Sequence, residues 1–107
     1  METEQSIEWI KSIIGKIAFL KTNKNYEDSL KMIPASARIM KSWELLRLYI
    51  EDSDSLKKFP KLVHIWTEKR ACWLDNFVYY SDFIADLRFV GLRDALRGVC
   101  IVKRNNK

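Results

Sequence analysis

The residue types that most often do chemistry are scarce in this chain, which has one histidine and two cysteines in 107 residues. His64 stands among apolar neighbours, as a packed structural histidine does. Cys72 and Cys100 form no CxxC pair, and with His64 they fall short of the four or so ligands that zinc needs. Asp82 and Asp86 are spaced one helical turn apart, but solvated carboxylates are the more ordinary interpretation. The sequence therefore predicts no enzyme, no metal site and no cofactor.

Charge is the stronger signal, because the net charge of +5 is unevenly placed along the chain. Residues 1–54 carry eight basic and nine acidic side chains, whereas residues 55–107 carry eleven basic and five acidic ones. A basic end indicates an acidic partner, whether lipid headgroups, nucleic acid or an acidic protein, although it is also typical of a tail that only aids solubility. The candidate contacts with a membrane or an acidic partner are Lys31, Arg38, Lys41, Arg93, Arg97 and Arg104.

The elements expected to carry these residues are helices, since three glycines and two prolines leave little material for the turns of a β fold. Isoleucines recur at three- and four-residue steps in segment 6–21, as in an amphipathic helix. A second helical pattern runs over 26–51, with Asn25 as its N-cap and an interruption at Pro34. In its second half one apolar face is formed by Ala37, Met40, Trp43, Leu46 and Ile50. Residues 52–55 are expected to form a loop and cap.

Two further helical patterns complete the expected fold. One begins near Pro60 and continues to about residue 89, and the other covers residues 91–104. Together these patterns predict an all-α protein, a small bundle of four to five helices in a single domain over residues 1–107. The C-terminal tail, about 103–107, is expected to fray.

The stretch WLDNFVYY (73–80) is dense in aromatics and encloses an Asp-Asn pair. With its flanks it resembles the hallmark of the peroxin-11 family, peroxisomal membrane proteins that elongate and divide peroxisomes. The residues that follow the hallmark order, or pack the helix beside it, are Arg70, Trp73, Leu74, Asp75, Asn76, Phe77, Val78, Tyr79 and Tyr80. The resemblance covers about residues 26–85. It implies an amphipathic helix lying in one leaflet, with Lys and Arg side chains on the headgroups.

Three functions follow from these observations. The first is a non-enzymatic, membrane-associated helical protein that shapes or divides peroxisomes. The second is a helical adaptor, possible as a homo-oligomer, that binds a protein through an aromatic surface. The third, a basic nucleic-acid-binding bundle, has less support, because the basic stripe is short. No apolar run reaches 18 residues and the N-terminus lacks the pattern of a signal peptide, so we expect an intracellular protein, peroxisomal if the resemblance holds.

Overall fold

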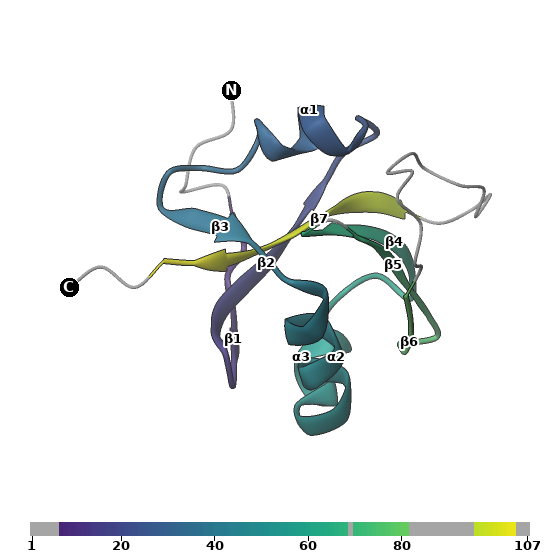
Figure 1. Ribbon diagram of the computed structural model, residues 1–107. Coiled ribbons are helices and arrows are strands. Elements are labelled where there is room, and N and C mark those ends of the chain that lie inside the picture. Colours follow the sequence, from purple (N-terminus) through teal and green to yellow (C-terminus); the bar gives the residue numbers. More distant parts are fainter. Residues whose placement is uncertain (1–6, 69, 82–95, 105–107) are drawn as a thin grey trace.

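The computed structural model describes residues 7–68, 70–81 and 96–104, and these form a β-rich fold (Figure 1). The strands are β1 (Ile10–Ser12), β2 (Gly15–Lys21), β3 (Ala37–Ile39), β4 (Leu62–Thr67), β5 (Arg70–Asp75), β6 (Val78–Ser81) and β7 (Leu96–Lys103). The helices are short: α1 (Tyr26–Leu30), α2 (Ser42–Glu51) and α3 (Ser53–Leu56). The predicted all-α bundle of four to five helices is therefore wrong.

The strands form one curled sheet in the order β1-β2-β7-β4-β5-β6, with β3 pairing to β7 off this path. Strand β7 is the centre of the sheet. It pairs with β2 along one side, while on its other side the first half pairs with β4 and the second half with β3. The β4–β7 pairing is parallel and every other pairing is antiparallel. Because β3 pairs with β7, the segment that follows α1 lies beside the end of the described chain.

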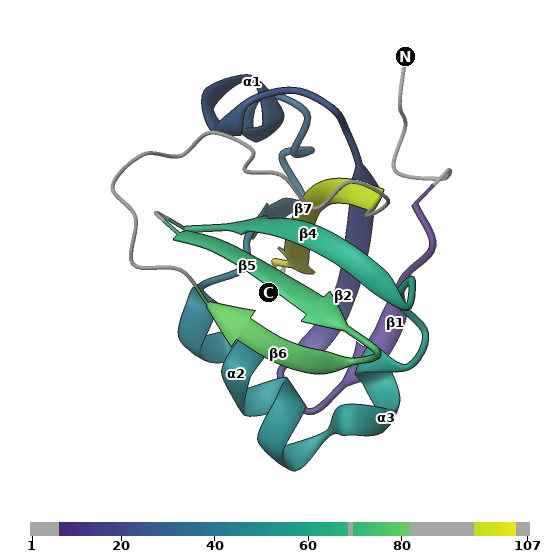
Figure 2. The same ribbon diagram turned by 90° about the vertical axis from the view of Figure 1, so that its right-hand side faces the viewer.

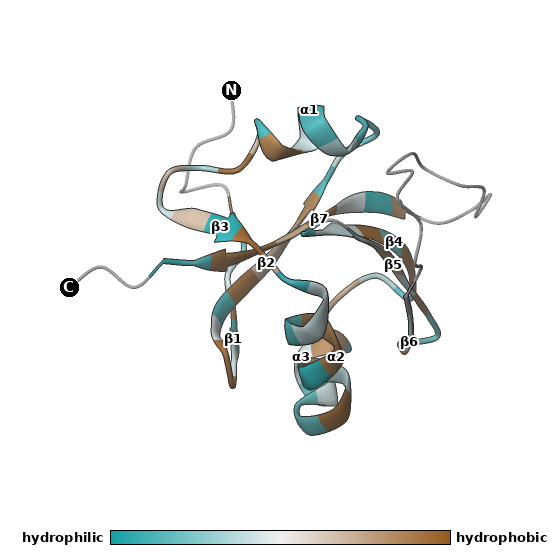
Figure 3. Ribbon diagram, viewed as in Figure 1, coloured by the Kyte–Doolittle hydropathy of each residue, from teal (hydrophilic) through white to brown (hydrophobic). Residues whose placement is uncertain are grey.

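Both faces of the sheet are buried, which explains why the strands were not recognised in the sequence. One face packs against α2 and α3, and the other lies beneath α1 and the segment that leads to β3 (Figures 1 and 2). Along β2, Ile17 belongs to the first core cluster and Ala18 and Leu20 to the second. Strands covered on both sides read as continuous apolar runs without polar alternation (Figure 3). Such runs also satisfy the three- and four-residue steps of a helix.

The predicted N-terminal helix is a hairpin of β1 and β2. Directly after the turn between these strands, β2 begins with Gly15 at φ 114°, a conformation that L-residues rarely adopt. Ile10 then pairs with Ile17, and the Ser12 hydroxyl donates to the Gly15 carbonyl at 2.7 Å. Gly15 is therefore the first residue of β2, directly after the turn, and it does not lie inside a helix.

The second predicted helical segment is correct only in part. Asn25 does cap α1, because its Oδ1 accepts from the Asp28 N–H at 2.8 Å. The chain then leaves the helix before Pro34, forms β3 and re-enters a helix at Ser42. In α2 the buried residues are Glu44, Leu45 and Leu48, so Trp43, Leu46 and Ile50 of the predicted apolar face point outward. The other two members of that face, Ala37 and Met40, precede α2 and are buried.

The last two predicted helices are also wrong within the described residues. Segment 62–81 is the three-strand meander β4-β5-β6, and residues 96–103 form β7. Lys103, which we placed in a frayed tail, is the last residue of β7, and the Arg104 N–H donates to the Ser36 carbonyl at 2.7 Å. Asp82 and Asp86 lie outside the described residues.

Candidate functional site

Three of the six predicted basic contact residues gather around one hollow. Arg38 is in β3, Lys41 follows two residues after that strand, and Arg104 directly follows β7. Antiparallel pairing of β3 with β7 sets Ala37 opposite Lys103 and Arg38 opposite Val102. Arg104, more than 60 positions from the other two cations in the chain, therefore becomes their neighbour through the sheet.

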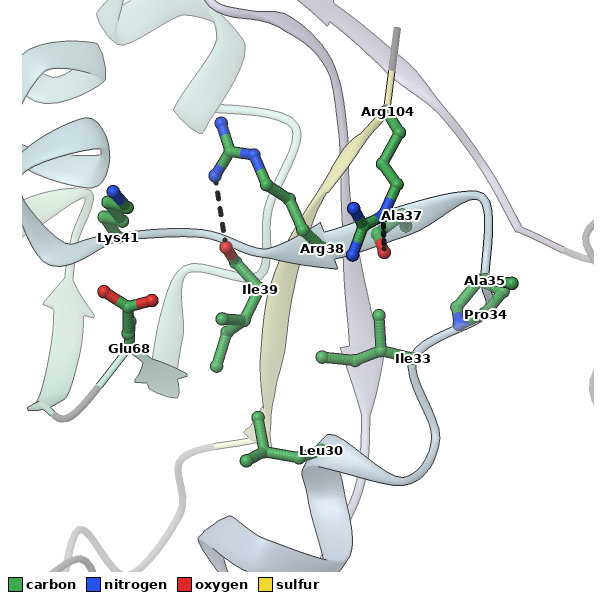
Figure 4. Close-up of a pocket in the computed structure, with 10 residues that line it drawn as sticks. All are labelled: Leu30, Ile33, Pro34, Ala35, Ala37, Arg38, Ile39, Lys41, Glu68 and Arg104. Atoms are coloured by element: carbon green, nitrogen blue, oxygen red, sulfur yellow. Dashed lines mark hydrogen bonds between the residues drawn. The ribbon is translucent and has the colours of Figure 1, made fainter. Parts of the chain in front are cut away.

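The hollow lies between α1 and β3 and has a volume of about 430 Å³ (Figure 4). Its apolar lining comes mainly from the α1–β3 segment, and its polar lining comes from that segment, from the turn after β4 and from the end of β7. The lining residues are Leu30, Ile33, Pro34, Ala35, Ala37, Arg38, Ile39, Lys41, Glu68 and Arg104. Apolar side chains thus form the floor, and charged groups stand at the rim.

Arg38 is held by a buried carboxylate. Its Nη1 and Nη2 donate to Oε1 and Oε2 of Glu44, each at 2.8 Å, and Oε1 also accepts from the Lys41 N–H at 2.9 Å. The Glu44 side chain is only 5% exposed, while that of Arg38 is 38% exposed. Burial alone would raise the pKa of Glu44, but the hydrogen bonds from Arg38 and from the Lys41 backbone, with the charges of both, hold it below its ordinary value. The hydrogen bond to Glu44 in turn raises the pKa of Arg38.

The two arginines also cover the outer edge of β3. Backbone groups of alternate residues in a strand point to opposite sides, and those of Arg38 face β7, so those of Ala37 and Ile39 face outward. The Ala37 carbonyl accepts from Arg104 Nε at 3.0 Å, and the Ile39 carbonyl accepts from Arg38 Nη1 at 3.2 Å (Figure 4). Both guanidinium groups therefore have a structural task, since they block a strand edge that another chain would otherwise pair with.

Lys41 and Arg104 carry the charges that remain open to a ligand. Both residues are exposed, and the ion pairs found within the described residues include neither of them. Glu68 also lines the hollow and adds one negative charge, close enough to contribute to the raised pKa of Arg38. With Arg38 neutralised by Glu44, the rim retains a net charge of about +1.

The other predicted contact residues do not join this group. Lys31 caps the C-terminus of α1, is exposed, and lies 3.5 Å from the carboxylate of Asp28. Arg97 is half-buried in β7 opposite His64 of β4, on a different part of the sheet. Arg93 lies outside the described residues. The structure thus places three of the predicted cations at one site and leaves two elsewhere.

The stretch that resembles the peroxin-11 hallmark is a β-hairpin, so the predicted helix over it is wrong. Arg70, Trp73 and Asp75 belong to β5, while Tyr79 and Tyr80 belong to β6. Trp73 pairs with Tyr80 across the two strands, and their rings stack with centroids 5.7 Å apart. A helix would also have placed these two side chains on one face, because they are seven residues apart, which is close to two helical turns.

Asn76 of the Asp-Asn pair forms the turn of that hairpin together with Phe77. Asn76 and Phe77 lie at φ 52° and 68°, as both central residues of a two-residue type I′ turn must. The Asn76 N–H donates to the Lys61 carbonyl at 2.9 Å, and its side chain contacts the exposed Asp75 carboxylate at 3.4 Å. Tyr79 faces the other way, toward α2, where its ring stacks on Tyr49 at 6.2 Å. This stretch therefore organises a strand pair and not a membrane-facing helix.

The membrane-associated helical protein that we predicted is accordingly not supported, and neither is the helical adaptor. The amphipathic helices that both functions require are largely strands. None of the helices in the described residues is long and apolar enough to cross a bilayer. Those residues also hold no group of three or more His, Cys, Asp or Glu side chains that could bind a metal ion.

Comparisons with known proteins add no relative. No protein-family model matches the sequence, and neither a curated protein nor a solved structure matches it. The resemblance to peroxin-11 is thus tested by none of them.

The sequence did not reveal the apolar and acidic members of the site. Leu30, Ile33, Ile39, Glu44 and Glu68 are not among the residues that the sequence singled out. One signal did exist for Glu44, since it stands third in α2 and its carboxylate caps the Lys41 N–H. No comparable signal marks Glu68, which lines the hollow and whose N–H donates to the Met40 carbonyl at 3.0 Å.

Proposed function

We propose that this chain is a non-enzymatic binding module that holds an acidic segment of a protein partner in the hollow between α1 and β3. A carboxylate of the partner pairs with Lys41 or with Arg104, which stand at opposite ends of the hollow, and an adjacent apolar side chain rests on Leu30, Ile33 and Ile39. One observation supports this most directly. Two exposed cations without an ion pair among the described residues stand at the rim of an apolar-floored hollow.

The shape of the hollow favours a protein segment over a small molecule. Sites for small molecules enclose most of the ligand surface. This hollow is open to solvent, and within the part of the chain that the structure describes its lining comes from residues 30–41, Glu68 and Arg104. An extended segment can instead lie across it and contact the floor with one side chain and the rim with the next, because successive side chains of an extended chain alternate in direction.

The number and placement of the charges also favour a protein over the other acidic partners. Nucleic-acid binding typically uses on the order of 6–10 phosphate contacts, whereas the rim offers two open cations beside Glu68. A membrane surface is broad and nearly flat on this scale, so cations around a hollow meet it less well than cations on a protruding face. A single carboxylate fits the net charge of about +1.

The test is a titration of the protein with an end-blocked peptide that alternates Glu with Leu and Phe. Binding is monitored through the amide chemical shifts of the protein. The matched probe is the same peptide with Gln in place of Glu. We expect the Glu peptide to shift the resonances of Ile39, Lys41 and Glu68, and its affinity to fall with rising salt because the charges are exposed. The Gln peptide is expected to bind more weakly, since exposed ion pairs contribute about 0.2–1 kcal/mol each.

Variants separate the hollow from the general positive charge of the protein. Lys41→Gln is expected to weaken binding of the Glu peptide by about two- to fivefold, and combining it with Arg104→Gln to weaken binding further. The control Lys16→Gln/Lys61→Gln removes two exposed positive charges outside the hollow. An equal loss of affinity in the control would contradict the proposal, as would equal binding of the Glu and Gln peptides.

A further inference from the structure

Helix α2 carries its exposed apolar residues on the side that faces away from the core. Trp43 is 57% exposed, Leu46 38% and Ile50 70%, while Leu45 and Leu48 are fully buried. At 100° per residue these three exposed side chains fall within about 60° of one another, and their mean direction is opposite to that of the buried residues. Helices that are apolar on both sides are normally covered on both sides.

We infer that a second copy of this chain covers this outer face, through antiparallel packing of α2 on α2 about a two-fold axis near Leu46. We call the outer face, Trp43, Leu46 and Ile50, the α2 stripe. In such a pair the large Trp43 of one copy lies against the smaller Ile50 of the other, and Leu46 lies beside its own counterpart. A two-fold interface must match itself, and the stripe comes close to this because Trp43 lies three residues from Leu46 on one side and Ile50 lies four residues from it on the other.

The charges beside the stripe agree with this orientation. Glu51 is at the C-terminal end of α2, where the helix dipole disfavours a negative charge. Antiparallel packing brings it beside the positive N-terminal end of the other α2, whereas parallel packing would align both dipoles and place the Trp43 side chains together. Arg47, next to the stripe, is 3.4 Å from Glu51, so each copy brings a neutralised pair to the interface and not a bare cation.

The size of the stripe indicates a weak dimer. A stable interface removes roughly 800 Å² from each partner, and a ten-residue helix is only about 15 Å long. We therefore expect monomers at low micromolar concentration and dimers toward the millimolar range. The hollow between α1 and β3 does not include the stripe residues, so this inference stands apart from the proposed binding of an acidic segment.

The first test is sedimentation of the whole chain over that concentration range. The weight-average mass is expected to rise from 12.7 kDa toward twice that value. Ile50→Lys should hold the mass at that of the monomer, because it sets a charge in the centre of one contact. Ile13→Lys makes the same chemical change at another exposed isoleucine, in the turn between β1 and β2, and should leave the mass curve unchanged.

A second test fixes the orientation by oxidative crosslinking, using the fact that Cys72 and Cys100 are buried. Leu46→Cys should crosslink two copies, because the two positions are adjacent at the axis. Ile50→Cys should not, because antiparallel packing sets its two copies about 10 Å apart, beyond the roughly 7 Å that a disulfide spans. A mass that stays at 12.7 kDa throughout, an equal effect of Ile13→Lys, or efficient crosslinking by Ile50→Cys would overturn the inference.

Discussion

Substituting alanine for Gly98 has opposite expected effects in the observed sheet and in the predicted helix. Gly98 lies in β7 opposite Lys21 of β2, and the ring of Phe19 passes over it. A Cβ at this position would lie against the carbonyl oxygen of Leu20 and only 2.5 Å from Cζ of Phe19. Ordinary carbon contacts are about 3.5–4.0 Å, so either the ring or the backbone of β2 must move.

The magnitude follows from what must move. Overpacking a well-filled core costs about 1–3 kcal/mol, and occasionally more. Because one obstructing atom here is a backbone carbonyl in the central strand pairing, we expect Gly98→Ala to lower the free energy of unfolding by about 3 kcal/mol. In a helix the same substitution would raise it by about 1 kcal/mol. The sign of the change in the free energy of unfolding therefore distinguishes the observed sheet from the predicted helix.

The assay is equilibrium unfolding in urea, followed by tryptophan fluorescence and far-ultraviolet circular dichroism. Gly15→Ala is the matched glycine control, because a Cβ there meets nothing within 4 Å and acts only through the positive φ. Phe19→Leu should recover part of the loss in Gly98→Ala, with a coupling of about 1 kcal/mol, and should not couple to Gly15→Ala. A Gly98→Ala protein as stable as the wild type, or more stable, would refute the pairing of β2 with β7.

Three further substitutions test local features of the fold by the same unfolding assay. Glu44→Gln should cost about 1–3 kcal/mol at neutral pH, because it breaks a charged pair with the partly exposed Arg38. Folding lowers the pKa of Glu44, so its carboxylate stabilises the fold at pH values above its unfolded pKa of about 4.3. This stabilisation is lost as the pH falls through the folded pKa. The free energy of unfolding of Glu44→Gln should therefore depend less steeply on pH at acidic pH. Asn25→Ala should cost about 1 kcal/mol by removing the α1 cap, and replacement by Ser should restore most of it. Phe77→Gly should raise stability by up to about 1 kcal/mol, since glycine suits its positive φ, and a clear loss would mean that the side chain of Phe77 outweighs its backbone strain.

Features fixed by neighbouring residues could be predicted from the sequence. The Asn25 cap depends on a carboxamide and an N–H three residues away, so its signal is complete within one turn. Asn76 is likewise of a residue type that favours turns, and together with Phe77 it forms the hairpin turn. The aromatics around it also match a helical spacing, which favoured the helix. The stacking of Trp73 on Tyr80 shows that cross-strand pairing places such residues together equally well.

Features fixed by distant pairings could not be predicted. The strands of this sheet are covered on both faces, so the alternation that identifies a half-exposed strand is absent in β2, β4 and β7. The cations of the hollow were singled out by charge alone. Their convergence depends on the pairing of β3 with β7, which no local pattern in either segment encodes. Sequence reasoning therefore identified the cations of the hollow but assigned them to helices, whereas the structure places them in or next to strands.

The α2 stripe shows how one reasonable assumption inverts an interpretation. An apolar face at helical spacing is usually the buried face, so the predicted face with Trp43, Leu46 and Ile50 would ordinarily lie against the core. The core instead takes Leu45 and Leu48, together with Glu44, whose burial is tolerated because Arg38 pairs with both of its oxygens. Once an ion pair lets a charged residue face inward, the apolar residues that would have faced the core are free to face outward. The apolar spacing of Trp43, Leu46 and Ile50 does not mark the core of a single chain, and it is thus the reason to expect that two copies of the chain pack through α2.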